Sequence, residues 1–345
     1  MDILLIDYRS IKAHQNFNKI HIGALMRLGH RVTLIGKAGH FDDIEDTSHI
    51  NKIIIPDRFF KKYPFAQITE RLRELFCLLW LRRKINYSAF DLVVIPTYDI
   101  LSFFLFRINN KTILINHNNV SQLDNRVKLW LTKTLPNHYV HVALNELMKD
   151  RLGYLLQGKR IYHIPHGILY LDRQETRPAF IEDEKPFIFC PINSNYDYSF
   201  LQSVFSSEDL KAYLESRGII LFVKKSMGLI TNSSNIIDLS VLSDADYNYM
   251  LSHSKAVILP YGIDFKYRCS GILFECVNFN TPVLATEIDD LLLYKGVINI
   301  DYFHDVSSLI KELDNCMYNK NTIYDYSKLI PDHYWESVIS SEVGA

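Results

Sequence analysis

A basic loop that leads into a serine and a glycine has residue types suited to binding an anion. The loop 261–269 carries Lys266 and Arg268 and follows a short apolar run typical of a buried strand. Ser270 is a favourable N-cap for the apolar helix predicted next, and Gly271 lets a ligand come close to the backbone. Free N–H groups and the helix dipole favour phosphate at such a helix N-terminus, and the two cations could neutralise it.

A carboxylate stands about one turn further along the same predicted helix. Glu275 is placed to accept hydrogen bonds from sugar hydroxyls, and the amides of Ser270 to Ile272 together with Tyr261 complete the predicted ligand site. The same pattern is also typical of an ordinary strand–helix–strand unit with a capped helix and a surface ion pair. Both interpretations remain open on this stretch alone.

Further polar residues follow other predicted strands. They are Arg9 and His14 after the strand at 3–7, His117 and Asn118 after the strand at 112–116, and Lys224 after the strand at 219–223. Ligands of doubly wound sheets bind at the carboxyl ends of the strands, so we predict these residues as ligand contacts. The simpler alternatives are that His117 only bonds to the backbone of its loop, and that Lys224 and its neighbour Lys225 are a solvated pair.

Buried apolar runs alternate with helical patterns through most of the chain, which indicates an α/β protein with parallel sheets. We predict long helices at 66–84 and 121–135 and a helical tail over 306–340. The G-x-G-x-x-G fingerprint is absent after the first strand, which argues against a dinucleotide-dependent oxidoreductase.

The stretch around Glu275 resembles the nucleotide-sugar loop of GT-B glycosyltransferases, especially the retaining glycosyltransferase family 4, whose pattern is Glu-x7-Glu. The run from Ser270 to Cys276 and the Asn-Thr-Pro-Val-Leu-Ala-Thr after it match the second half of that pattern. Glu275 falls on the second Glu, which in the family binds the nucleotide ribose, and Tyr267 replaces the first Glu. The segment 161–168 resembles the hinge that ends the family's first domain, with His166 in place of the usual Asn.

The resemblance implies a GT-B fold, in which two Rossmann-like doubly wound domains face a cleft. The implied division is an acceptor-binding domain at 1–168, a linker at 169–186, a nucleotide-sugar-binding domain at 187–325 and a C-terminal helix at 326–345 that crosses back to the first domain. In the family a histidine at the position of His117 contacts the donor sugar.

The implied activity moves a sugar from a nucleotide diphosphate sugar to a glycan or lipid-linked acceptor, in bacterial surface polysaccharide synthesis. Arg268 and Lys266 would stabilise the leaving diphosphate. The resemblance implies no metal, and we expect no cofactor besides the donor. A retaining enzyme needs no side-chain base, whereas an inverting one would draw its base from Asp7, His14 or His117.

Two alternatives remain open. A nucleotide-sugar 2-epimerase shares the two-domain fold and would turn over the donor with no acceptor. A catalytically idle protein that binds a nucleotide sugar or a lipid surface is the other, since Tyr267 departs from the family pattern.

Composition and charge limit the remaining possibilities. Residues 1–165 hold 24 Lys and Arg against 14 Asp and Glu, although the whole chain has a net charge of −1, so the first half is expected to face an anionic partner. The segment 58–84 mixes basic and aromatic residues, which suits an anionic membrane surface or a solvated helix face.

No nucleic-acid motif is present. The scattered cysteines and the lack of a secretory signal predict a cytoplasmic protein, and the lack of a long apolar run predicts no membrane-spanning helix.

Overall fold

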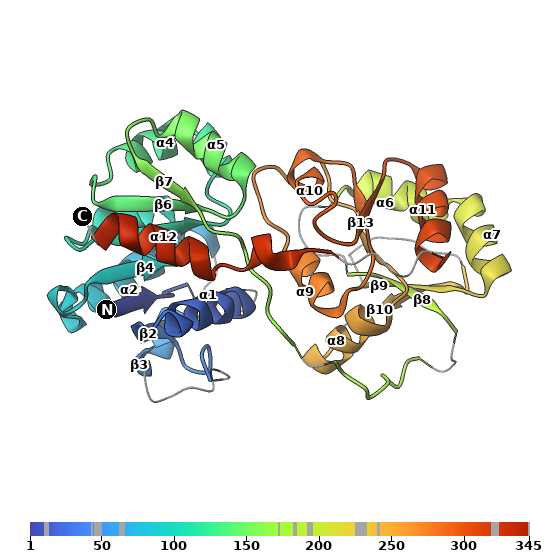
Figure 1. Ribbon diagram of the computed structural model, residues 1–345, viewed down its shortest axis with the longest axis horizontal. Helices are drawn as coiled ribbons and strands as arrows, with labels where there is room; N and C mark the ends of the chain where they lie inside the picture. The colour runs from blue at the N-terminus through green and yellow to red at the C-terminus, as the bar shows by residue number, and fades with distance from the viewer. Residues whose placement is uncertain are drawn as a thin grey trace. The chain divides into compact units, whose positions relative to one another are not determined.

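The chain forms two compact units in the computed structural model, each built around one parallel sheet (Figure 1). Unit 1 contains Met1–Leu169, Tyr267–Cys269 and Lys328–Ala345, and unit 2 contains Tyr170–Lys266 and Ser270–Ser327. The residues that the structure describes are 1–9, 14–42, 44, 50–61, 66–171, 173–181, 185–191, 196–224, 233–239, 242–318 and 324–343. The predicted α/β class is confirmed.

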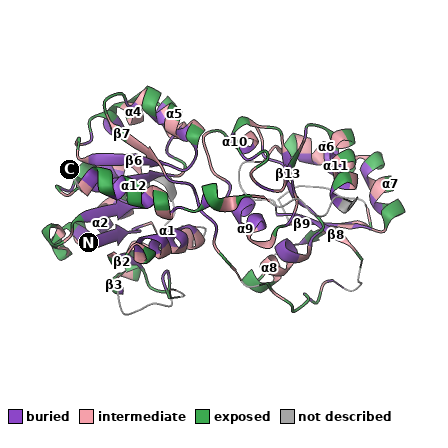
Figure 2. Cartoon of the chain, viewed as in Figure 1, coloured by how far each residue is buried: buried purple, intermediate pink, exposed green. Residues whose placement is uncertain are grey.

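Unit 1 has a seven-stranded sheet in the order β3-β2-β1-β4-β5-β6-β7, and all neighbouring strands are parallel. Its strands are β1 (Asp2–Ile6), β2 (Arg31–Lys37), β3 (Ile50–Ile55), β4 (Leu92–Ile95), β5 (Thr112–Asn116), β6 (Tyr139–Ala143) and β7 (Arg160–His163). The central strands are almost continuously apolar because helices cover the sheet, and these strands are drawn as buried in Figure 2.

The helices of unit 1 are α1 (Gln15–Arg27), α2 (Ala66–Lys84), α3 (Ile100–Phe106), α4 (Arg126–Lys133), α5 (Glu146–Leu155) and α12 (Asp332–Val343). Three of them, α3, α4 and α5, begin at polar caps that the sequence supplies. Asp99 accepts a hydrogen bond from the Ser102 N–H at 2.9 Å, and Asn145 accepts one from the Met148 N–H at 2.8 Å. These caps satisfy N–H groups that have no partner inside the helix.

Two predicted helices differ from the observed ones. The segment predicted as one helix over 121–135 starts as a 3-10 turn at Ser121–Asp124, and Asn125 then adopts an extended conformation and caps α4. The tail predicted over 306–340 contains α11 (Val306–Tyr318) and α12 with a 3-10 turn at Tyr326–Leu329 between them. Pro331 precedes α12, and a proline disfavours helical geometry in the residue before it.

Helix α12 packs on α1 and completes the core of unit 1 (Figure 1). The indole N–H of fully buried Trp335 donates to Nδ1 of His21 at 2.9 Å. Buried Glu342 pairs with Arg160 and accepts a hydrogen bond from the Tyr162 hydroxyl at 2.9 Å. The chain therefore returns to its first sheet after forming unit 2.

Gly167 should tolerate no side chain, because it has a φ of +86° and an added Cβ would lie 2.4 Å from Cγ2 of Ile20. We expect Gly167→Ala to lower the free energy of unfolding of unit 1 by about 1–3 kcal/mol. Urea unfolding followed by tryptophan fluorescence measures this, since all three tryptophans, at 80, 130 and 335, belong to unit 1. The matched control is Gly153→Ala within α5, where an added Cβ meets nothing within 4 Å. An equal effect of both substitutions would contradict the prediction.

Unit 2 has a six-stranded parallel sheet in the order β10-β9-β8-β11-β12-β13. Its strands are β8 (Phe187–Cys190), β9 (Ile220–Lys224), β10 (Ile236–Leu239), β11 (Val257–Leu259), β12 (Val283–Thr286) and β13 (Ile300–Phe303). Its helices are α6 (Tyr198–Ser206), α7 (Glu208–Arg217), α8 (Asp244–His253), α9 (Gly271–Phe279), α10 (Asp289–Leu292) and α11.

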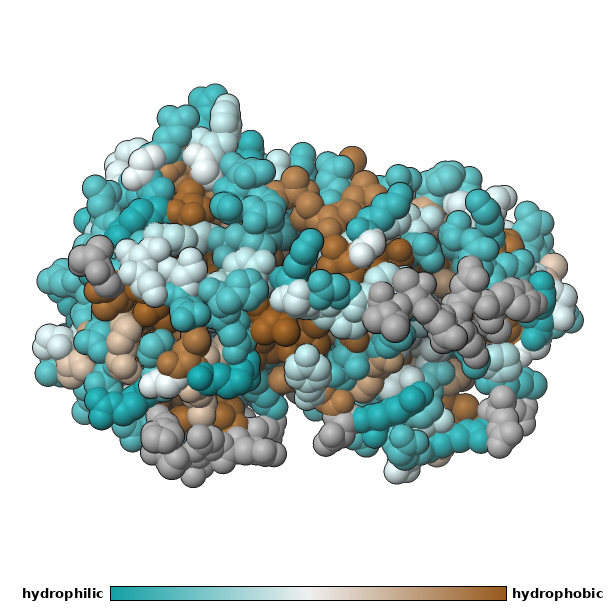
Figure 3. Space-filling model, in the orientation of Figure 1, coloured by the Kyte–Doolittle hydropathy of each residue, from teal (hydrophilic) through white to brown (hydrophobic). Residues whose placement is uncertain are grey.

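The surface is mixed in character. On the face that Figure 3 shows, hydrophilic and hydrophobic residues are interspersed. None of the helices in the described part of the chain is both long and apolar enough to cross a membrane.

Candidate functional site

Each sheet has a point where the chain reverses the direction in which it adds strands. In unit 1, β1 leads to β2 on one side, while the neighbouring β4 leads to β5 on the other. In unit 2, β8 leads to β9 while the neighbouring β11 leads to β12. Doubly wound sheets bind ligands beyond the carboxyl ends of the strands at this point, so each unit has one expected ligand crevice.

The N-terminus of α9 stands after β11 in unit 2, as predicted from the sequence. Buried Ser270 is its N-cap, and its hydroxyl oxygen accepts from the Leu273 N–H at 3.2 Å. The Tyr261 hydroxyl lies 2.8 Å from the same oxygen, and its ring stacks on Phe265 at 4.0 Å between centroids. The side chains of Ser270 and Tyr261 thus brace the start of the helix, and the backbone amides of Gly271 and Ile272 are the groups there that could bind an anion.

Glu275 and Lys224 are brought together by a residue that the sequence analysis did not select. The hydroxyl of Tyr247, on α8, donates to Oε2 of Glu275 at 3.2 Å, and Lys224 Nζ lies 5.8 Å from the centre of the Tyr247 ring. Burial, with Glu275 nearby, raises the pKa of Tyr247 well above its ordinary value, so the phenol keeps its proton. Tyr247 therefore orients the Glu275 carboxylate. Its helical position alone gave no signal of this role.

The loop before α9 holds its residues in different environments. Lys266 is exposed, and Arg268 is partly buried. The Arg268 carbonyl accepts a hydrogen bond from the Asn145 side chain at 3.2 Å. Tyr267, which replaces the first Glu of the family pattern, has a φ of +54°, a conformation that costs energy for a bulky residue. The Arg151 guanidinium lies over its ring at 5.5 Å.

Asp7 forms a buried polar cluster at the carboxyl end of β1. Its Oδ2 lies 2.7 Å from the Asn18 amide nitrogen and 2.9 Å from Nε2 of His40. All three side chains are buried, so hydrogen bonds hold the carboxylate in place of water. Asp7, predicted as one possible base, is thereby fixed in orientation.

Four histidines gather around Phe17 in the same unit. His14 and His117 stack with their ring centres 4.7 Å apart, and the ring of Phe17 lies 4.1 Å from that of His117. His21 and His166 also contact Phe17, at 4.1 and 5.1 Å. The structure thus brings together the predicted His14 and His117 from segments about 100 residues apart.

Burial keeps this histidine cluster neutral. Burial and the neighbouring imidazoles lower the pKa of His117 well below its ordinary value, and burial lowers that of His14. Nε2 of His117 and Nδ1 of His14 have no hydrogen-bond partner among the described residues. A neutral imidazole with an unpaired nitrogen is suited to contact a sugar hydroxyl or to accept its proton.

Arg9 lies beside a buried glutamate that the sequence analysis missed. Nε of Arg9 is 2.9 Å from Oε1 of Glu74 on α2, although the angle is unsuitable for a hydrogen bond. Glu74 is only 2% exposed, and burial raises its pKa to about 7 although Arg9 opposes the shift. The pair stands near Tyr8 and Asp99, which follow β1 and β4 at the chain-reversal point. No local pattern links Glu74 with Arg9, because 65 residues separate them.

Asn118 is exposed, and its carbonyl accepts a hydrogen bond from the Gln122 side chain at 3.1 Å. Its neighbour Asn119 is buried, and its side chain donates to the Tyr98 carbonyl at 3.2 Å. The loop after β5 is therefore anchored by Asn119, while Asn118 is exposed and His117 is half-buried.

Glu74 should make unit 1 less stable as the pH rises. In the folded chain its pKa is about 7, whereas an unfolded Glu titrates near 4.3, so between these values only the folded state holds the proton. We expect the stability of the wild type, relative to Glu74→Gln, to fall by about 3 kcal/mol between pH 4.5 and pH 8. Urea unfolding of both proteins, followed by tryptophan fluorescence, measures the difference. A difference independent of pH would show that the Glu74 pKa is ordinary.

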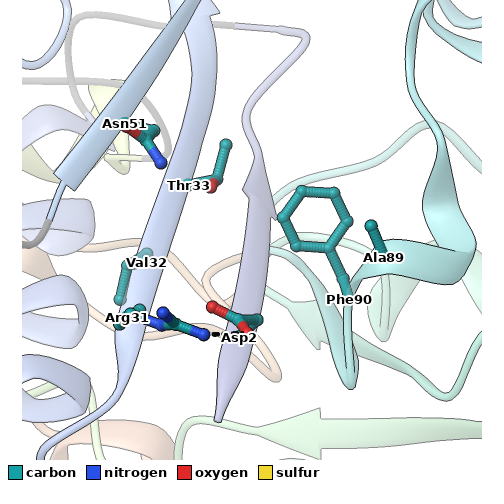
Figure 4. Close-up of a pocket in the computed structure, with 7 residues that line it drawn as sticks. All are labelled: Asp2, Arg31, Val32, Thr33, Asn51, Ala89 and Phe90. Carbon is teal, nitrogen blue, oxygen red and sulfur yellow. Dashed lines mark hydrogen bonds and ion pairs between the residues drawn. The ribbon is translucent and has the colours of Figure 1, made fainter.

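A cavity of about 360 Å³ lies at the opposite edge of the unit 1 sheet (Figure 4). Asp2 and Arg31, which start β1 and β2, point toward each other and form an ion pair on its wall. This cavity lies at the amino ends of the strands, whereas the expected ligand crevice lies at their carboxyl ends. Among the described residues, no group of three or more His, Cys, Asp or Glu is placed to hold a metal ion.

No family model matches the sequence, and no curated protein matches it. Solved structures are similar over nearly the whole chain. Sucrose-phosphate synthase from Thermosynechococcus elongatus has a TM-score of 0.59 at 12% identity, covering 100% of this chain and 94% of that one. HepE from Anabaena in complex with UDP-glucose has a TM-score of 0.57 at 13% identity, covering 99% and 95%.

The UDP-GlcNAc 2-epimerase from Methanocaldococcus jannaschii has a TM-score of 0.60 at 12% identity, covering 98% of each chain. At such identities the likeness establishes the fold and leaves the activity to the site residues. The two parallel sheets, their helices and the full-length similarity together show that this chain has the GT-B fold.

Proposed function

We propose that this chain is a glycosyltransferase that uses a nucleotide diphosphate sugar as its donor. The observation that carries the proposal is the start of α9, where a capped N-terminus and Glu275 stand together beyond β11. This arrangement offers amides for a diphosphate and a carboxylate for a ribose. The GT-B fold supports the proposal.

In the proposed donor complex, the amides of Gly271 and Ile272 bind the diphosphate. Arg268 and Lys266 balance the charge that develops on it as the sugar leaves. Glu275, oriented by Tyr247, accepts from the ribose hydroxyls. Lys224, at the end of β9, adds a positive charge over the face of the Tyr247 ring.

In the proposed acceptor complex, unit 1 binds a glycan or a lipid-linked sugar. Arg9, His14 and Asn118 contact the acceptor, and His117 contacts the transferred sugar. We assign residues 1–168 to acceptor binding, 169–186 to a linker, 187–325 to donor binding and 326–345 to the returning tail. The reaction needs no metal and no cofactor besides the donor.

The proton released by the acceptor has several possible destinations in unit 1. If the reaction retains configuration, the departing diphosphate can take the proton itself. If it inverts configuration, a side-chain base is required, and Glu74 joins Asp7, His14 and His117 because its pKa of about 7 suits proton transfer at neutral pH. Glu74→Gln would then remove a pH dependence of the rate near pH 7.

A nucleotide-sugar 2-epimerase is the second candidate. The gathering of His14, His117 and His166 in unit 1 favours it, because an epimerase needs proton-transfer groups that converge on the donor. A protein that binds the donor without turnover is the third candidate, since Tyr267 occupies the first Glu position of the pattern.

Nucleotide release from UDP-glucose, UDP-GlcNAc and GDP-mannose, measured with and without free or lipid-linked glycan, tests the proposal. We expect release that depends on the acceptor. Epimer formation without acceptor would identify the epimerase instead, and donor binding without turnover would identify the binding protein. A cytoplasmic role in surface polysaccharide synthesis remains part of the proposal and follows only if a lipid-linked acceptor is used.

A further inference from the structure

Three neighbouring helices of unit 1 concentrate exposed apolar side chains. Six of the thirteen exposed large apolar residues in the described chain lie on α2, α3 and α4, which have 19, 7 and 8 residues. We call these six residues the α2–α4 face: Leu72, Phe76, Leu79, Leu105, Val127 and Trp130. Scattered single residues of this kind are normal, but a concentration on adjoining helices marks an interaction surface.

The apolar residues on α2 form a stripe. Leu72, Phe76 and Leu79 stand at positions i, i+4 and i+7, so they lie on one side of the helix. The opposite side of α2 supplies core residues such as Leu78 and Leu81, which are fully buried. The helix therefore has one apolar side in the core and a second one open to solvent.

The three helices are in contact, so the six residues lie on adjoining elements. Helix α2 packs on α3, where the Ser102 hydroxyl donates to the Arg71 carbonyl at 3.3 Å. Helix α3 packs on α4, where the rings of Phe104 and Trp130 lie 6.3 Å apart. Phe76, Leu105 and Trp130, from the three helices, are each about 60% exposed.

The same helices carry an excess of basic residues. Helices α2 and α4, together with Arg107 after α3, contain nine Lys and Arg against two Glu. Arg83 continues the α2 stripe, and the Arg107 guanidinium lies 4.5 Å from the centre of the Phe104 ring. The two acids add little exposed negative charge, because Glu74 is buried and Glu70 lies 3.5 Å from Arg73.

We propose that the α2–α4 face docks on the surface of an anionic lipid bilayer. Trp, Phe and Leu side chains enter the boundary between headgroups and acyl chains, and Arg and Lys side chains of the same helices bind lipid phosphates. Charge complementarity identifies the occupant, since a partner must be both anionic and apolar over three helices. The α2 part of this face belongs to the segment 58–84, for which the sequence left a membrane surface and a solvated helix face open, and residues 62–65 of that segment lie outside the described residues.

Co-sedimentation with phosphatidylcholine vesicles containing 30% phosphatidylglycerol tests the proposal. We expect the wild type to bind these vesicles at low salt and to bind pure phosphatidylcholine at least ten times more weakly. The triple variant Phe76→Ser, Leu105→Ser, Trp130→Ser should lower binding at least about 10-fold. The variant Arg82→Gln, Arg83→Gln, Lys84→Gln should lower it by about 100-fold, at roughly fivefold per charge.

The matched control is Tyr154→Ser, Tyr170→Ser, Ile330→Ser, which removes three exposed apolar side chains elsewhere. It should bind vesicles like the wild type. Circular dichroism and release of nucleotide from donor with a soluble acceptor should be the same for all variants, because none of the substituted residues lies in either crevice. Equal vesicle binding by wild type and the Phe76 triple variant would overturn the proposal. So would a wild-type dimer in size-exclusion chromatography that the triple variant abolishes without any vesicle binding, since the face would then join two copies.

Discussion

Replacing Arg268 with alanine should lower the rate of sugar transfer by about 10²–10³-fold while leaving the protein folded. In the sequence, Arg268 comes two residues before Ser270, the cap of α9, where the leaving diphosphate is proposed to gather charge. Its backbone is fixed through the hydrogen bond from Asn145 to its carbonyl. A side chain that acts mainly in the transition state should change kcat more than KM. Steady-state kinetics with a saturating acceptor measures the effect.

Two further variants separate charge from structure. Arg268→Lys keeps the charge but loses the paired donors of the guanidinium, so its activity should fall between those of wild type and Arg268→Ala. Lys266→Ala should have a smaller effect, because Lys266 is exposed and its charge is screened by water. A rate for Arg268→Ala within twofold of the wild type would contradict the assignment, provided that its thermal unfolding is unchanged.

Replacing Glu275 with alanine should weaken binding of UDP or GDP, whichever the protein binds, by about 10- to 100-fold. Hydrogen bonds to a charged group contribute about 1.5–3 kcal/mol, and the alanine removes those from the ribose hydroxyls. Isothermal titration calorimetry measures the dissociation constant. The loss should affect nucleotides but leave the affinity for inorganic pyrophosphate unchanged, because pyrophosphate has no ribose.

The control for this substitution is Tyr247→Phe. It removes only the hydroxyl that donates to Glu275 at 3.2 Å, so the carboxylate remains but is held less firmly. We expect a loss of only a few-fold in nucleotide affinity. An unchanged affinity in Glu275→Ala would exclude this carboxylate from the donor site, and the proposed ribose contact would fail with it.

The parts of the site that the sequence predicted are those formed within one short segment. Ser270 caps α9 because a serine before an apolar helix bonds to an N–H three residues later, and this rule is local. The place of Glu275 on the same helix follows from its position five residues after Ser270. The positions of His117 and Lys224 followed from strand ends, because parallel strands present their carboxyl ends at one edge.

The parts that the sequence could not predict depend on contacts between distant segments. Glu74 meets Arg9 only because α2 crosses from β3 to β4 and passes the end of β1. Tyr247 meets Glu275 only because α8 packs beside α9. The cap at Asn125, in contrast, was available locally, but its neighbours have enough helical character to hide the break in the predicted helix.

The return of α12 to unit 1 bears on how the protein forms during translation. Residues 1–169 leave the ribosome long before residues 332–343, which supply the buried Trp335 and Glu342. Until then the side of α1 that α12 covers, with His21, has no partner from that helix. Unit 2, which is encoded in between, can therefore fold as a whole before unit 1 is finished. The half that starts first is the half that matures last.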